Sequence, residues 1–138
     1  MSESLPYWKQ TITVCNKLNG KDSSTGKDTW KKTVVHNCFF KQKVSSSVSG
    51  TQVSIGASYI VRIPQNDDYK PYNEWKSSQI GFTLSVGDYI FKEEISEAIT
   101  ADNIISVFNS HKPDAMFVKA VSDVSEWGIL PHYHVEGV

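Results

Sequence analysis

The chain has 138 residues, of which 39% are hydrophobic and 12% aromatic, so it can bury one core and is too apolar to stay disordered. Its formal net charge of −1 argues against general nucleic-acid binding, which needs a basic field. No stretch approaches the ~18 apolar residues of a membrane helix, and residues 1–6 lack the pattern of a secretory signal. We therefore expect one domain over residues 1–138, in the cytoplasm, with no membrane and no specific nucleic-acid partner.

The first part of the chain predicts two strands joined by a polar loop. Alternating apolar and polar residues indicate a strand at residues 10–18, after an N-terminal arm at residues 1–8 that we expect to be loosely ordered. The loop at residues 19–28 is rich in glycine and polar residues, as turns are. A second strand follows at residues 29–43. A strand of that length needs a bend or a bulge, which we place near Asn37.

A third strand and a long connection come next. The strand covers about residues 53–63 and ends at Pro64, because proline has no amide hydrogen for the ladder. The serine-rich segment 45–50 before it is expected to be a flexible tip. Residues 65–80 form a long polar connection, and connections of this length are usually functional or disordered. Its three aromatic residues favour an ordered loop or a short helical turn.

The second half of the chain predicts short strands and one helix. Strands are expected at residues 82–86, 89–92, 115–124 and 132–136. The spacing of Ile104, Ile105 and Phe108 predicts a short helix at about residues 101–110, with Thr100 as its N-cap. In the last strand, two histidines would lie on one face and two apolar residues on the other. About seven strands with one short helix and long loops indicate a mainly β fold, a small β-barrel or sandwich.

Four residues raise the question of a metal site. His36 and Cys38 stand two apart on one predicted strand, and His132 and His134 do so on another. Residues i and i+2 of a strand share a face, so neighbouring strands could supply the ligands of a Cys-His₃ zinc site. Neither pair has zinc-finger spacing, however, and the strands need not be neighbours. We favour surface histidines and, for Cys38 and Cys15, buried free thiols, and we assign no metal and no cofactor.

Residues for catalysis are not evident. The sequence contains no glycine-rich phosphate-binding motif. The acidic pairs at residues 67–68 and 93–94 fall on predicted turns, where adjacent carboxylates face water rather than each other. A Cys38 nucleophile would need an exposed thiol of low pKa, whereas its apolar neighbours favour burial. We therefore assign no catalytic residue and expect a protein that is not an enzyme.

Tyr69, Tyr72 and Trp75 are the candidate partner-binding residues. Their spacing of three would place them along one side of a helical turn. Packing against the core is the favoured interpretation. A partner-binding anchor is the alternative, because tyrosine and tryptophan dominate interface hot spots. The sequence leaves both open.

The charge is distributed unevenly along the chain. Residues 1–43 carry eight lysines against three acidic residues, a balance of +5, and the remainder carries six basic and twelve acidic residues, a balance of −6. The two balances give the net charge of −1. Such an asymmetry suits a protein that docks between partners or stacks head to tail, although two-signed surfaces are common in monomers as well.

Several segments, in order and spacing, resemble a family of small prophage proteins of Gram-positive bacteria that are encoded among head–tail joining genes. The resembling segments are TITVCNK (11–17), TW (29–30), VHNCFF (35–40), RIP (62–64), FTLSVGDYI (82–90) and HYHVEG (132–137). Together they span most of residues 10–138, and no single motif is diagnostic. The serine-rich segment 45–50 departs from the pattern.

The resemblance implies a head-completion or stopper-like component of the head–tail connector. Such proteins are similar in size, are often small β-barrels with long loops, and form rings beneath the portal. It implies other phage structural proteins as partners, namely the portal or adaptor and the tail terminator. The location would be the host cytoplasm during assembly and then the virion, with a homo-oligomeric ring in the particle and a monomer in isolation. Two alternatives stay open: a tail terminator or minor tail protein, and a small metal- or ligand-binding β-barrel.

Overall fold

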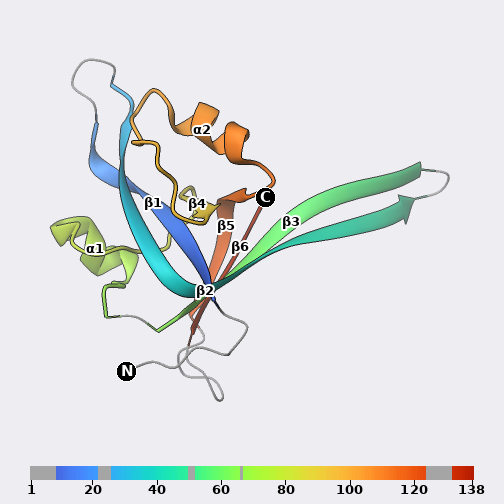
Figure 1. The fold of residues 1–138 in the computed structure, drawn as a ribbon, viewed down its shortest axis with the longest axis horizontal. Coiled ribbons are helices and arrows are strands. Elements are labelled where there is room, and N and C mark those ends of the chain that lie inside the picture. Colours follow the sequence, from blue (N-terminus) through green and yellow to red (C-terminus); the bar gives the residue numbers. More distant parts are fainter. Residues whose placement is uncertain (1–8, 22–25, 50–51, 66, 124–131) are drawn as a thin grey trace.

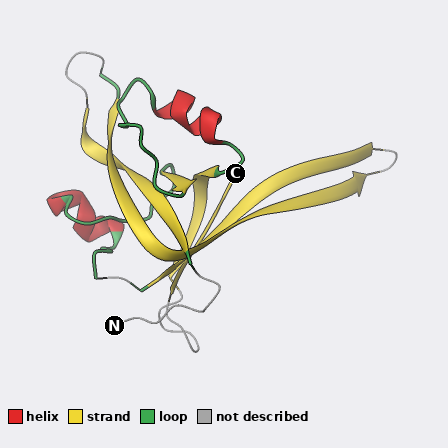
Figure 2. Cartoon of the chain, viewed as in Figure 1, coloured by secondary structure: helices red, strands yellow, loops and turns green. Residues whose placement is uncertain are grey.

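The computed structural model describes residues 9–21, 26–49, 52–65, 67–123 and 132–138, and within them the chain forms six strands and two helices. In chain order these are β1 (Gln10–Lys21), β2 (Asp28–Ser49), β3 (Gln52–Pro64), α1 (Tyr72–Ser78), β4 (Tyr89–Lys92), α2 (Ile104–His111), β5 (Ala115–Asp123) and β6 (His132–Gly137). The strands close into an antiparallel barrel in the order β1-β2-β3-β6-β5-β4 (Figures 1 and 2). The predicted mainly β fold, a small barrel, is confirmed, with a second helix in addition.

The bulge predicted near Asn37 is present in β2. Gln10 of β1 lies opposite Cys38, whereas Ile12 lies opposite Val35, so β2 carries one extra residue across this step. Asn37 has a φ of 61°, a left-handed conformation that asparagine tolerates better than most residues. The bulge shifts the alternation, and Val35 and Cys38 are therefore both buried.

The closing strand β6 has the two faces that the sequence predicts. Tyr133 and Val135 pack in the barrel interior, and His132 and His134, at the alternate positions, are half-buried. In the strand β5, an irregularity between Val118 and Ala120 changes the alternation of its two faces. As a result Val121, and not Ala120, packs against the interior.

The predicted strand at residues 82–86 is not formed. Only Phe82 makes a bridge, to Tyr69. The next residue, Thr83, pairs with a side chain instead of a strand: its amide donates to Asn16 Oδ1 over 3.2 Å, and Asn16 Nδ2 donates to its carbonyl over 2.7 Å. The side-chain amide of Asn16 thus makes the hydrogen bonds that a neighbouring strand would make, and residues 82–86 form a loop.

The start of the second helix also differs from its prediction. The helix α2 begins at Ile104, and Thr100 does not cap it. The amide of Thr100 donates to Asn103 Oδ1 over 2.7 Å, and Thr100 Oγ1 accepts from the amide of Asn103 over 3.3 Å. These two hydrogen bonds close the turn that precedes the helix. In the connection before β4, α1 confirms the expected helical turn.

The serine-rich segment predicted as a flexible tip is mostly strand. Residues 45–49 continue β2 and pair residue by residue with β3, so the prediction was wrong for them. Serine composition resembles a loop, but the unbroken antiparallel register decides the structure. The predicted N-terminal arm at residues 1–8 lies outside the described residues.

Two hydrophobic clusters hold the barrel together. One fills its interior and consists mainly of Ile12, Val14, Val35, Phe40, Val61, Ile63, Phe82, Ile90, Met116, Val118, Tyr133 and Val135. The other lies between the outer wall and α2 and contains Cys15, Phe91, Ile95, Ile104, Val107, Phe108 and Ala115. The strands β1 and β4 are therefore buried on both faces. No helix in the described parts of the chain is long and apolar enough to span a membrane.

Candidate functional site

The bulge at Asn37 separates His36 from Cys38. Cys38 is fully buried in the barrel interior, whereas His36 is exposed, with its Nδ1 atom 3.1 Å from Thr11 Oγ1. The two residues therefore do not present ligands to one point. The i, i+2 rule on which the predicted zinc pair depended does not apply across a bulge.

The second predicted pair is not adjacent to the first. The strand β3 lies between β2 and β6, so that Arg62 is paired with Phe39 on one side and with His134 on the other. His134 Nε2 lies 3.5 Å from Glu136 Oε1. Within the described residues, no group of three or more His, Cys, Asp or Glu is placed to hold a metal ion. The four candidate ligands are thus not brought together.

Both cysteines are buried free thiols, as the sequence predicts. Burial raises the pKa of Cys15 and of Cys38 to about 12. A thiol of such a pKa stays protonated near neutral pH and is a poor nucleophile and a poor metal ligand.

The candidate anchors Tyr69, Tyr72 and Trp75 have different environments. Trp75 is fully buried, and its Nε1 donates to the Gly81 carbonyl over 3.2 Å. Tyr69 stacks on Tyr133 with ring centroids 4.0 Å apart and packs against the interior cluster. Tyr72 is 44% exposed on α1. Packing accounts for the first two residues, and a partner-binding role stays a prediction for Tyr72.

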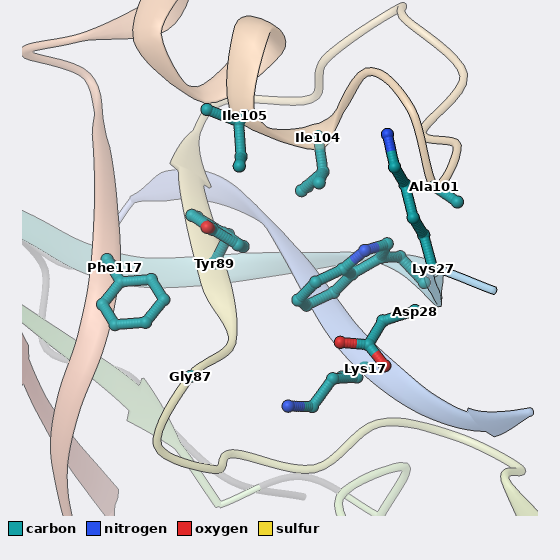
Figure 3. Close-up of a pocket in the computed structure, with 10 residues that line it drawn as sticks. Lys17, Lys27, Asp28, Gly87, Tyr89, Ala101, Ile104, Ile105 and Phe117 are labelled. Atoms are coloured by element: carbon teal, nitrogen blue, oxygen red, sulfur yellow. The ribbon is translucent and has the colours of Figure 1, made fainter. Parts of the chain in front are cut away.

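A cleft of about 400 Å³ lies between α2 and the outer wall of the barrel. Figure 3 shows the side chains that line it: Lys17, Lys27, Asp28, Trp30, Tyr89, Ala101, Ile104, Ile105 and Phe117, together with Gly87. Three aromatic rings from β2, β4 and β5 are in edge contact, with Tyr89 5.3 Å from Trp30 and 5.1 Å from Phe117 between ring centroids. Ile105 is 62% exposed at its rim.

The chemistry of this cleft favours contact over catalysis. The described residues that line the cleft include no histidine, cysteine or glutamate. Asp28 contributes a carboxylate to the lining. Lys27 Nζ pairs with Asp102 Oδ1 at 3.2 Å, and both side chains are largely exposed. An aromatic wall with cationic residues at one end can receive an apolar or aromatic group, but it does not pair an acid with a base or a nucleophile with a base.

A second feature of the described chain is a ribbon that we call the hairpin arm, formed by residues 43–49 of β2 and 52–58 of β3. It projects from the barrel (Figure 1). The last β2 residue that pairs with β1 is Cys38, and β6 pairs only with residues 59–64 of β3. Among the described strands, those of the arm therefore pair only with each other, and both outer edges of the ribbon are open.

Apart from Lys43 at its base, the arm carries no charged residue, and its positions alternate between two faces. The sequence contains no charged residue between Lys43 and Arg62. The register opposes Val44 with Ala57, Ser46 with Ile55 and Val48 with Val53, and these positions share the ribbon face of the core pair Phe40–Val61. The positions between them are opposed as Ser45–Gly56, Ser47–Ser54 and Ser49–Gln52. Sequence reasoning missed the arm, although the charge-free run and the even spacing of Val44 and Val48 were visible.

A family model described as a family of unknown function, DUF6751, matches residues 7–138. Comparisons with curated proteins and with solved structures gave no match.

Proposed function

We propose that this chain, which belongs to the DUF6751 family, is a structural subunit of a phage-type assembly and not an enzyme. Within that class we favour the head–tail connector, as a head-completion or stopper component. The observation that carries the proposal is the hairpin arm, a long ribbon without charged residues beyond Lys43, with two open edges and no covering element in the described chain. Open strand edges of this kind are sites of pairing with another chain.

The barrel supports a structural role by being filled. Its interior is packed with buried hydrophobic side chains of the described strands. The alternative of a metal- or ligand-binding barrel would need a deep pocket that His36 and His132 line together. His36 instead borders a polar groove with Gln10, Glu93 and Lys92, and His132 does not line it.

The proposal includes the partners and the place that the resemblance implies. These are a homo-oligomeric ring in the particle, the portal or adaptor on one side and the tail terminator on the other, in the host cytoplasm and then in the virion. The opposite charge balances of residues 1–43 and 44–138 would favour contacts between unlike ends of neighbouring subunits.

The runner-up, a tail terminator or minor tail protein, would use the arm in the same way. Gene order separates the two: portal and capsid genes immediately upstream favour the connector, and a neighbouring tape-measure gene favours the tail.

Deletion of the gene from an active phage that carries it is the direct test. A connector subunit predicts full-length tails and filled heads that fail to join, seen by electron microscopy and restored by the gene in trans. Tails of abnormal length would support the terminator instead. Normal joined virions from the deletion strain would overturn both.

The same complementation assay tests Tyr72. If this exposed tyrosine is a partner anchor, Tyr72→Ala lowers the plaque count while the unfolding midpoint of the purified protein is unchanged. Asn73→Ala, at the exposed neighbouring position on α1, is the matched control.

A further inference from the structure

We propose that the hairpin arm pairs edge to edge with the arm of a second copy of this chain, the β2 edge of one copy meeting the β3 edge of the next. The inference deepens the proposed function, on which it rests for the side-by-side arrangement of copies. It assigns the contact between subunits to residues 43–49 and 52–58.

The edges of the arm need a partner. Each open edge presents backbone amide and carbonyl groups that a neighbouring strand would satisfy. Soluble proteins usually protect such edges with lysine, proline or a covering element. Between Lys43 and Arg62 the sequence contains neither a charged residue nor a proline. A two-stranded ribbon is at best marginally stable by itself, so a further strand on either side would stabilise it.

Further copies of this chain, one on each side of the arm, satisfy both edges. A different protein that added one strand would cover one edge and leave the other open. Copies that stand in the same orientation place β2 of one beside β3 of the next, antiparallel, as the two strands already are within each arm. Each copy then supplies one edge and receives another, which is the heterologous contact that builds rings. The absence of charged residues beyond Lys43 limits like-charge repulsion between identical surfaces.

The size of the contact sets its strength. Seven residues per strand at roughly 3.3 Å each give an edge of about 23 Å. One such edge buries much less than the roughly 800 Å² per partner of a stable complex. We therefore expect monomers in dilute solution, with pairing at high protein concentration or in a closed ring, where every copy makes two contacts.

Disulfide trapping between copies tests the pairing directly. Ser45→Cys, Ser47→Cys and Ser49→Cys on β2 are each mixed with Ser54→Cys on β3, so that three registers are sampled on one face of the ribbon. Neighbouring strands lie about 4.8 Å apart, within disulfide reach, whereas the same residue in successive copies would be roughly 9.6 Å apart. The native thiols do not compete, because burial raises their pKa to about 12.

The expected result, at about 1 mM protein under mild oxidation, is a covalent heterodimer in at least one mixture, several-fold more abundant than the homodimer of either variant alone. Asn73→Cys mixed with Ser54→Cys is the control and should give no such excess. Homodimers of single variants in equal yield, or no excess in any mixture, would overturn the proposal. Trapping that succeeds while the phage deletion still yields joined virions would retain this inference and remove the proposed function, and the reverse result would do the opposite.

Discussion

The barrel and the hairpin arm use the same two strands, β2 and β3, in contrasting environments. In the barrel, β2 is flanked by β1 and β3, and its inward residues pack on a filled interior. In the arm the same strands continue the same alternation, but among the described strands they pair only with each other. Backbone pairing and alternation therefore suffice to define a strand, whereas the stability of a strand depends on what covers its faces and edges.

The largest expected difference between the two regions concerns one face of β3. Val61 is fully buried in the barrel, and Ile55 occupies the same face six residues earlier, in the arm. We expect Val61→Ser to lower the unfolding free energy by about 2–4 kcal/mol, because it removes buried apolar volume and buries a hydroxyl. Ile55→Ser should change it by less than about 0.5 kcal/mol. Urea unfolding of dilute monomer measures both, and equal losses would contradict the comparison.

Barrel closure should be nearly as sensitive. A side chain added to Gly137 on β6 would overlap the carbonyl oxygen of Phe117 on β5, which is backbone and cannot move aside cheaply. We expect Gly137→Ala to cost about 1–3 kcal/mol through overpacking. Glu136→Ala, at the exposed neighbouring position, should be close to neutral in the same thermal unfolding experiment. A neutral Gly137→Ala would mean that the two strands are free to separate.

Asp88 is a buried acid in the barrel, whereas the arm carries no charged residue beyond Lys43. Its carboxylate accepts hydrogen bonds from the amides of Lys17 and Ser85, both over 3.1 Å, and from Asn16 Nδ2 over 2.9 Å. Asp88→Asn keeps the shape but turns a donor toward these donors. We expect a loss of about 1–3 kcal/mol, measured by urea unfolding at pH 7. Asp102→Asn, a largely exposed control, should change stability little.

The pH dependence gives the same residue a second test. Burial raises the pKa of Asp88 from its ordinary 3.8 to about 6. Between these values the folded chain retains a proton that the unfolded chain releases, so the contribution of Asp88 to stability falls as pH rises through the window. The advantage of the native protein over Asp88→Asn should therefore be larger near pH 4.5 than near pH 7. A stability advantage that grows with pH would show that the hydrogen bonds to the carboxylate lower the pKa of Asp88 by more than burial raises it.

The residue pattern within a segment predicted those elements of the fold that depend on that segment alone. The alternation of apolar and polar residues located β1 and the two faces of β6. Pro64 located the end of β3, because proline has no amide hydrogen to donate to a neighbouring strand. The loop at residues 82–86 was mistaken for a strand because its pairing partner is the side chain of Asn16, which is 67 residues away from Thr83 in sequence. No periodicity within the segment records such a contact.

The candidate site was harder to predict, because it depends on which elements become neighbours. The zinc hypothesis assumed that the strands of His36 and His134 were adjacent, and β3 separates them. The cleft combines rings from three strands with a helix, and nothing in the spacing of Trp30, Tyr89 and Phe117 indicates that they meet. For the arm, serine composition favoured a loop over the alternation that was also present.

The smallest expected effect concerns removal of the arm. Lys43 and Ser58 lie directly opposite each other, so residues 44–57 can be replaced by a two-residue Asn-Gly turn without disturbing the ladder below. Because the described arm pairs with no strand of the barrel, we expect the unfolding free energy of dilute monomer to change by less than about 0.5 kcal/mol. Chemical cross-linking with a reagent that forms no disulfides, at high protein concentration, should yield linked oligomers of the full-length chain and none of the shortened chain. A destabilisation of several kcal/mol would instead make the ribbon part of the folding unit, and its open edges would then serve the barrel and not a neighbouring copy.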